Sequence, residues 1–339
     1  MDVDPVMIVL GTRRYARFVA SANLLKGFLG ALLKFFFAPI PREKGASADK
    51  TVRDIEENLR NGVSVAMFPE GNKSWDGETA FISKRTATLV KDAGVALVTY
   101  RFVGNYMRNP RWAKHKRHGR IYGAAVNEYS AEQVANMSAD ELYAVICNDL
   151  KVNAYEVQRE NPQPYKGKKL AEGLELAAYL CPVCKKFDVI KTSGDEITCT
   201  CCGMSATLDD VGFFHSDNLP FDNLCDWSHW QKKYISENAE TIKNMKGIIS
   251  KDEDVSFRIN GETIDEKAKV RIFGDRISVL TKNKIYDYLF KDIQKVGAFR
   301  TTRVYLTSKD DYLEFYKPDG ISGTKIFTLW RAFIGKKVY

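Results

Sequence analysis

Hydrophobic and polar residues alternate with helical and strand periods along the first 125 residues. Residues 49–62 and 83–94 have an amphipathic spacing and each stretch ends at a glycine, which predicts two helices. The short apolar runs 63–68 and 95–104 predict buried strands. Helices that alternate with strands in this way are typical of an α/β domain, and we expect a mixed sheet flanked by helices.

The pattern changes in the second half of the chain. Residues 130–160 again have helical spacing, with Ser-x-x-Gln and Ser-x-x-Glu pairs typical of capping boxes, and the segment "NPQPYKGKK" that follows predicts a linker. Residues 254–316 form short alternating runs separated by turn residues, and residues 323–335 predict a closing helix. These runs predict a small, β-rich α+β domain.

One apolar segment deserves two interpretations. Residues 23–41 are interrupted only by Lys26 and Lys34, which lie on one side of a helix. The segment therefore predicts either an amphipathic helix in a membrane interface or a buried helix whose lysines reach its edge. The chain contains no run of 18 apolar residues, so we expect no membrane-spanning helix.

The charge distribution suggests a phosphate ligand. The net charge is +8, and residues 101–120 carry seven Lys or Arg, two His and no acidic residue. Such a patch attracts phosphate on nucleic acid, on lipid headgroups or on a small substrate, although a solvated basic face is the alternative.

Four of the seven cysteines have the spacing of a metal site. Cys181-x-x-Cys184 and Cys199-x-x-Cys202 are separated by 14 residues, a spacing that resembles a zinc ribbon. Cys201 could compete with Cys199, but the symmetry of the two pairs favours Cys199. Four thiolates fill all positions of a tetrahedral ion, so we predict a structural zinc. The absence of a basic leader and of a disulfide pattern predicts a cytoplasmic protein.

The stretch "VSVAMFPEGNKSWDGE" (63–78) has the most specific chemistry. An apolar strand runs into Pro69, and the next residues combine a carboxylate, a flexible backbone, donors and a cation, all suited to phosphate. We call residues 70–74 the acceptor loop; its members are Glu70, Gly71, Asn72, Lys73 and Ser74. A lone Pro-Glu-Gly is common in ordinary turns, so the wider pattern carries the interpretation.

That wider pattern resembles the glycerol-3-phosphate and 1-acylglycerol-3-phosphate O-acyltransferase family, of the bacterial type with a zinc ribbon and a C-terminal extension. FPEGNKS resembles its acceptor-binding block, and Arg42 matches an arginine that follows a hydrophobic stretch in another block. Residues 94–106 match a further block loosely, because Thr99 stands where a proline is usual. The resemblance covers residues 1–160.

The family's first block is His-x-x-x-x-Asp, whose His is the general base and whose Asp orients it. Asp4, followed by Pro5, matches the Asp, which places the His two positions before Met1. None of the four histidines (His115, His118, His215 and His229) has Asp five residues later. We therefore expect a chain that is truncated at its N-terminus. The alternatives are a homologue that binds lipid phosphate without turnover, or a coincidence at Asp4.

The resemblance implies acyl transfer from acyl-CoA or acyl carrier protein to the hydroxyl of a glycerophosphate acceptor in phospholipid synthesis. Asp4 would orient the base, Glu70 and Gly71 would line the acceptor site, and Arg42 and Lys73 would bind its phosphate. The plainer alternatives are that Arg42 is a surface cation and that Lys73 is an ordinary turn lysine. Residues 1–339 alone would be nearly inactive. We expect a protein bound peripherally to the anionic inner face of the membrane.

The predicted organisation has four parts: an acyltransferase domain at 1–160, a linker and zinc ribbon at 161–210, a connecting segment at 211–250, and a β-rich domain at 251–339. The last resembles pleckstrin-homology and GRAM domains weakly. A zinc-ribbon protein that uses residues 101–120 on nucleic acid is the rival hypothesis. It leaves FPEGNKS and Arg42 unexplained, so no nucleic-acid partner is expected.

Overall fold

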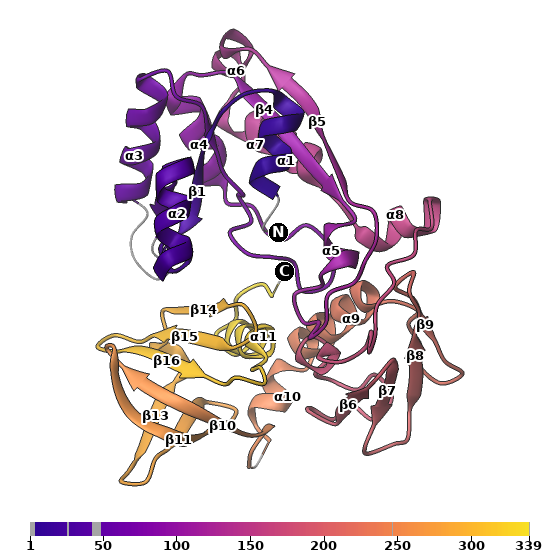
Figure 1. Cartoon of the computed structure of the whole chain (residues 1–339). Helices are drawn as coiled ribbons and strands as arrows, with labels where there is room; N and C mark the ends of the chain where they lie inside the picture. The colour runs from indigo at the N-terminus through magenta and orange to yellow at the C-terminus, as the bar shows by residue number, and fades with distance from the viewer. Residues whose placement is uncertain (1–3, 26, 43–48, 246, 339) are drawn as a thin grey trace. The chain divides into compact units, whose positions relative to one another are not determined.

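The computed structural model describes residues 4–25, 27–42, 49–245 and 247–338 (Figure 1). The chain divides into two compact units. Unit 1 consists of Met1–Ser74, Glu78–Asn105 and Arg120–Val157. Unit 2 consists of Trp75–Gly77, Tyr106–Gly119 and Gln158–Tyr339. Two short segments of the predicted acyltransferase domain, 75–77 and 106–119, therefore have their contacts in unit 2.

A small parallel sheet holds the first part of unit 1. Strand β1 (Arg17–Ser21) lies between β2 (Ile40–Arg42) and β3 (Val65–Ala66), and both neighbours run parallel to it. The helices that accompany these strands are α1 (Asp4–Thr12), the 3-10 helix η1 (Ala22–Leu25), α2 (Gly27–Phe37) and α3 (Asp49–Arg60). Within the described residues, no helix has the length and hydropathy needed to cross a membrane.

The rest of unit 1 is built on an antiparallel pair, β4 (Leu97–Val103) and β5 (Tyr122–Tyr129). Its helices are α4 (Lys84–Ala93), α6 (Ala131–Asn136), α7 (Ala139–Leu150) and most of α8 (Ala154–Glu160), while α5 (Asn105–Arg108) spans the boundary between the two units. Helices α4, α6 and α7 share a buried cluster that includes Ala87, Val134 and Leu142.

Local sequence signals set the ends of these helices, as predicted. The Ser83 side chain accepts a hydrogen bond from the Arg85 N–H at the start of α4, and Gly94 ends that helix in the left-handed conformation. Both predicted capping boxes are present: Ser130 with Gln133 begins α6, and Ser138 with Glu141 begins α7.

Both strands predicted in residues 63–68 and 95–104 are present, but the prediction that they are buried was wrong. β3 contains only two residues, and both are half-buried. In β4 only Thr99 is buried, and Val98 on the same strand is exposed. An apolar run can reflect a half-covered strand as well as a buried one, because periodicity alone does not show how many faces are covered.

The first part of unit 2 is a four-stranded antiparallel sheet in the order β6 (Ile190–Ser193), β7 (Glu196–Cys199), β8 (Ser205–Leu208) and β9 (Phe214–His215). The 3-10 helix η2 (Leu174–Leu176) precedes it, and α9 (Leu224–Glu237) and α10 (Ala239–Lys243) follow it. Trp227 on α9 is fully buried, and its indole N–H donates to the Leu180 carbonyl at 2.9 Å.

The second part of unit 2 is the predicted β-rich domain, a seven-stranded antiparallel sheet closed by a helix. Its strand order is β13-β12-β11-β10-β16-β15-β14. The elements are β10 (Ser250–Ile259), β11 (Glu262–Ile272), β12 (Arg276–Leu280), β13 (Ile285–Leu289), η3 (Phe290–Asp292), β14 (Lys295–Phe299), β15 (Arg303–Thr307), β16 (Tyr312–Tyr316) and α11 (Gly323–Phe333). The seven strands and terminal helix agree with the expected layout, while its pleckstrin-homology or GRAM character stays a prediction.

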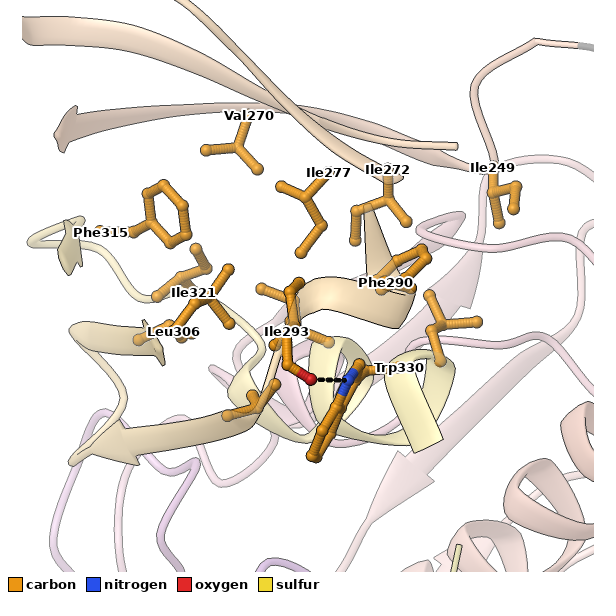
Figure 2. Close-up of a cluster of buried hydrophobic side chains, with 14 of the residues drawn as sticks. Ile249, Val270, Ile272, Ile277, Phe290, Ile293, Leu306, Phe315, Ile321 and Trp330 are labelled. Atoms are coloured by element: carbon orange, nitrogen blue, oxygen red, sulfur yellow. Dashed lines mark hydrogen bonds between the residues drawn. The ribbon is translucent and has the colours of Figure 1, made fainter. Parts of the chain in front are cut away.

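Helix α11 closes the core of this domain (Figure 2). Its Trp330 packs beside Phe290 and Ile293, and the Trp330 indole N–H donates to the Ile293 carbonyl at 3.2 Å. Side chains from the sheet, including Ile277 and Phe315, fill the space above the helix. The hydrogen bond satisfies the one polar group that the buried indole brings into an apolar core.

Candidate active site and metal centre

The carboxyl ends of the three parallel strands place Arg42 and the acceptor loop at one edge of the sheet. Ser21, the last residue of β1, is in register with Arg42, the last residue of β2. On the other side of β1, Ala66 ends β3 and the chain continues through Phe68 into the acceptor loop. Strands that run parallel end at the same edge, so residues distant in sequence meet there.

A tight turn shapes the start of the acceptor loop. The Gly71 N–H donates to the Phe68 carbonyl at 3.0 Å, and Gly71 has a φ of 66°. A side chain at position 71 would meet nothing within 4 Å, so the backbone conformation rather than lack of space requires glycine. The Glu70 carboxylate accepts a hydrogen bond from the Ala80 N–H at 2.7 Å and thereby closes the longer segment 70–80.

The remaining predicted acceptor residues are at least partly open to solvent. Asn72 is exposed, whereas Arg42, Lys73 and Ser74 are half-buried. A guanidinium, an ammonium and neutral donors at one sheet edge form a set that can bind a phosphate monoester. The block around Arg42 continues into residues 43–48, which lie outside the described residues.

Asp4 is the first residue of α1, and one of its hydrogen-bond partners is Asn105, the first residue of α5, two residues after β4 ends. The Asn105 side-chain amide donates to Asp4 Oδ1 at 3.0 Å. The same helix is held on β4 by the Tyr100 hydroxyl, which donates to the Met7 carbonyl at 3.3 Å. The match of Asp4 to a catalytic block therefore coincides with a position that the fold holds by side-chain contacts.

An aromatic cluster brings the acceptor loop and the helix of Asp4 to the same strand. The ring of Phe68, two residues before the loop, stacks on Phe102 with a centroid distance of 6.5 Å. Phe102 in turn packs against Tyr100 at 5.1 Å. The two halves of the predicted site thus share β4 as a common support.

Thr99, which stands at the usual proline position, binds a buried carboxylate that sequence reasoning missed. Its hydroxyl donates to Asp149 Oδ2 at 2.7 Å. Asn127 and Tyr129 also donate to Asp149, at 2.8 and 3.0 Å. A proline would remove the hydroxyl and leave Asp149 with one donor fewer, so the departure from the family pattern has a structural reason.

All four histidines belong to unit 2, whereas Asp4 belongs to unit 1. Two of them have acidic partners in their own unit: His115 Nε2 lies 3.1 Å from Glu172, and His215 Nε2 lies 2.7 Å from Asp209. None of the four histidines lies in unit 1, the unit that contains Asp4.

Two cations of the basic segment 101–120 serve packing in unit 2. The Arg117 guanidinium is 3% exposed, lies over the Trp112 ring and donates to the Leu170 carbonyl at 2.9 Å. Arg111 donates to the Ala298 and Arg300 carbonyls at 3.3 and 3.1 Å. Burial lowers the pKa of Arg111 to about 10, so it keeps its charge at neutral pH. The interpretation of a phosphate-binding or solvated face does not hold for these two residues.

Comparison with known proteins identifies the first part of the chain. Residues 1–103 match the family model "Acyltransferase", a span that includes Asp4, Arg42 and the acceptor loop. A search of curated proteins finds no match to this chain.

Among solved structures, this chain is similar to the 1-acyl-sn-glycerophosphate (LPA) acyltransferase PlsC from Thermotoga maritima. The two share 20% sequence identity with a TM-score of 0.38. The match covers 44% of this chain, which spans 60% of the length of that structure.

Outside the matched residues 1–103, the four predicted cysteines form a cluster that could hold a metal ion. The Sγ atoms of Cys181 and Cys202 are 3.7 Å apart, as are those of Cys184 and Cys199, and all four lie within 4.8 Å of one another. A tetrahedral zinc with bonds of about 2.3 Å separates its sulfurs by about 3.8 Å. Cys201 is exposed and is not part of this cluster, which contains Cys199.

Two matching backbone turns present these sulfurs. The Lys185 N–H donates to the Cys181 carbonyl at 3.0 Å, and the Gly203 N–H donates to the Cys199 carbonyl at 3.1 Å. Lys185 and Gly203 both have positive φ values, 59° and 74°. A hydrogen bond from the Met204 N–H lowers the pKa of Cys202 to about 7, which favours the thiolate that metals bind.

Proposed function

We propose that this protein transfers an acyl group from a thioester donor, acyl-CoA or acyl carrier protein, to the hydroxyl of a glycerophosphate acceptor. The observation that carries the proposal is the match of residues 1–103 to the acyltransferase family, because that span contains the predicted acceptor residues and Asp4. The convergence of Arg42 with the acceptor loop at one sheet edge supports it.

In the proposed reaction, Arg42 and Lys73 bind the acceptor phosphate and hold its hydroxyl in place. Lys73 supplies a point charge where the family usually has the bidentate fork of arginine, so Arg42 would give the directional contacts. Gly71 keeps the backbone of the loop open to the ligand. The hydroxyl attacks the thioester carbonyl, the new C–O bond forms as the C–S bond breaks, and the hydroxyl proton reaches the thiolate through a general base.

The general base would be a histidine five positions before Asp4, with Asp4 as its orienting partner. The test compares residues 1–339 with the same chain extended at its N-terminus so that a His stands at that position. We expect at least a hundredfold more acyl transfer to lysophosphatidate from the extended chain, since a positioned base contributes about 10²- to 10⁴-fold. An extension with Ala in place of that His is the control. Equal turnover of all three chains would refute the role of Asp4.

Binding of lipid phosphate without turnover is the second candidate function. It is favoured by the acceptor residues at the sheet edge together with the sequence of residues 1–339, in which no His is followed by Asp five residues later. Calorimetric titration with lysophosphatidate and the turnover of the His-extended chain together distinguish the two functions. A protein that only binds keeps its affinity in the extended chain and gains no turnover. Loss of affinity in Arg42→Ala and its retention in Lys73→Arg are expected in both cases.

A peripheral membrane location accords with unpacked apolar side chains in unit 1. Helix α1 buries none of its residues, and its Leu10 is exposed. On α2, Phe35 is 83% exposed, next to the exposed Lys34 and near Leu32. Apolar side chains beside a lysine suit the surface of an anionic bilayer. The lysine at position 26 lies outside the described residues.

We further propose that the cysteine cluster holds a structural zinc. Four protein sulfurs at tetrahedral spacing leave no open position, so the ion would hold Cys181, Cys184, Cys199 and Cys202 together and take no part in acyl transfer. A nucleic-acid partner is not expected, because Arg111 and Arg117 already bind carbonyl groups of unit 2. Liposome sedimentation should succeed where binding of DNA or RNA fails.

A further inference from the structure

The chain leaves unit 1 directly beside both halves of the proposed active site. Ser74, the last residue of the acceptor loop, is followed by Trp75, which belongs to unit 2. Asn105, the hydrogen-bond donor to Asp4, is followed by Tyr106, which also belongs to unit 2. Whatever fixes Trp75 and Tyr106 in unit 2 therefore acts on the adjoining active-site residues through the backbone.

The residues after these two crossing points are bonded to each other. The Tyr106 hydroxyl donates to the Trp75 carbonyl at 3.3 Å and accepts a hydrogen bond from the Trp112 indole N–H at 3.1 Å. Trp112 is buried and therefore gives Tyr106 a rigid support. The phenol hydroxyl thus links the segment after the acceptor loop to the segment after Asn105.

A cation and a carboxylate hold the first of these segments on unit 2. The Arg111 guanidinium lies 4.4 Å from the centre of the Trp75 ring. Asp76 is buried and accepts hydrogen bonds from Ser228 Oγ at 2.6 Å and from Lys232 Nζ at 2.7 Å, both on α9. A charged pair with so little solvent contact resists displacement, because separating it leaves a buried charge without its partner.

The segment is also fixed where it returns to unit 1. The Thr79 N–H donates to the Val152 carbonyl at 2.9 Å, and Glu78 pairs with Asn153 in an antiparallel bridge. The Glu70–Ala80 hydrogen bond closes the same stretch within unit 1. The acceptor loop therefore has one end held by unit 1 and the other continuing into residues that unit 2 holds.

We infer that the residues Trp75, Asp76, Tyr106 and Trp112, here called the anchor, set the conformation of the acceptor loop and hence its affinity for a phosphate-bearing acceptor. Asp76 and Tyr106 are positioning residues, since they act through the adjoining backbone. The inference rests on the proposed function. Unit 2 would then be a working part of the acyltransferase, because a displacement of about 1 Å at a binding group can change rates about a hundredfold.

Hydrogen exchange and acceptor binding test the inference on the full chain. The variants are Tyr106→Phe, which removes the hydroxyl of the link, and Asp76→Asn, which removes the charge that Lys232 binds. We expect backbone amides of residues 70–74 to exchange at least about fivefold faster in both. The dissociation constants for glycerol-3-phosphate and for short-chain lysophosphatidate should rise about tenfold or more.

Matched controls separate this effect from general loss of stability. Tyr122→Phe changes an exposed tyrosine of unit 1, and Asp222→Asn breaks the exposed ion pair with Arg159. Both should leave the loop and the acceptor affinity unchanged. Lys232→Arg keeps the charge beside Asp76 and should behave as wild type. Metal content and exchange in β12 should stay constant in every variant, because the anchor does not contribute to that strand.

Two results would overturn the inference. Unchanged exchange at residues 70–74 in both variants would show that the anchor does not order the loop. Faster exchange with unchanged acceptor affinity would show that the ordering has no bearing on the site. A wild-type chain that binds neither probe would refute the proposed function and, with it, any role of the anchor in acceptor binding, and the exchange rates would still show whether the anchor orders the loop.

Discussion

The most direct test of the architecture of unit 2 is the substitution Lys325→Met. Lys325 lies on α11 and is 1% exposed, and its ammonium donates to Asp188 Oδ1 at 2.8 Å and to Ser250 Oγ at 2.7 Å. Asp188 lies four residues after Cys184, between the cysteine cluster and β6. The pair therefore joins the cysteine-bearing sheet to the β-rich sheet of the same unit.

The expected loss of unfolding free energy in Lys325→Met follows from the distance between the two charges. Two unit charges 2.8 Å apart attract by about 6 kcal/mol at an effective dielectric constant of about 20, and desolvation offsets much of this. Removal of one partner leaves the other charge buried and typically costs about 3–5 kcal/mol. Asp188 keeps hydrogen bonds from Ser250 and from the Lys251 N–H, so we expect a loss of about 3 kcal/mol.

Tryptophan fluorescence is a specific assay for this unit. All five tryptophans (Trp75, Trp112, Trp227, Trp230 and Trp330) belong to unit 2, so urea unfolding followed by their emission reports the free energy of unfolding of that unit. Lys309→Met is the matched control, because Lys309 pairs with Asp292 at the surface and its side chain is 69% exposed. The control should lose less than about 1 kcal/mol.

The pH dependence of the free energy of unfolding gives a second, independent test. Burial alone would raise the pKa of Asp188, but the charge of Lys325 and the hydrogen bonds around the carboxylate hold it below its usual value. In the wild type the stabilisation that comes from ionised Asp188 is present at neutral pH, and it is lost only as the pH falls through the lowered pKa of Asp188. In Lys325→Met, burial without the neighbouring charge raises the pKa of Asp188. The loss of unfolding free energy relative to the wild type should therefore be largest at about pH 7 and shrink toward about pH 5. A loss at neutral pH no larger than that of Lys309→Met would refute the reasoning.

Three further predictions concern other parts of the chain. Purified protein should contain one zinc per chain; elemental analysis should show its loss in Cys199→Ser and its retention in Cys201→Ser, and equal zinc in both would contradict the assignment. Thr99→Val should destabilise unit 1 by about 1–3 kcal/mol, because Asp149 loses a donor, and hydrogen exchange in β4 and β5 should increase accordingly. Phe35→Ser should weaken sedimentation with anionic liposomes several-fold without changing the helical circular dichroism, and equal sedimentation would exclude this side chain as a membrane contact.

Local signals predicted the helices and the metal cluster well. A serine with a partner three residues later, or a glycine after the last helical turn, satisfies backbone groups within a few residues, so Ser130, Ser138 and Gly94 reveal helix ends from sequence alone. The two Cys-x-x-Cys turns are equally local. The choice of Cys199 over Cys201 needed only the symmetry of spacing.

Contacts between distant residues could not be read in the same way. Arg111 and Arg117 looked like a basic surface, but their partners are carbonyl groups at 298, 300 and 170, which no periodicity reveals. The buried Asp149 resembled an ordinary helix residue, since its donors lie on two strands. The convergence of Arg42 with the acceptor loop was implied by family resemblance and rests physically on the parallel pairing of β1 with both neighbours.

The interleaving of the two units has a consequence for how such a protein can evolve. A break in the gene after position 160 would retain Asp76 and Arg111, together with Trp75. It would discard Ser228 and Lys232, which donate to Asp76, and the carbonyl groups of residues 298 and 300, which accept from Arg111. The fragment would carry the buried Asp76 carboxylate and the half-buried Arg111 guanidinium into water-exposed positions without their partners. Recombination that shuffles whole domains at a single junction would therefore be selected against here, and the two units should be inherited together.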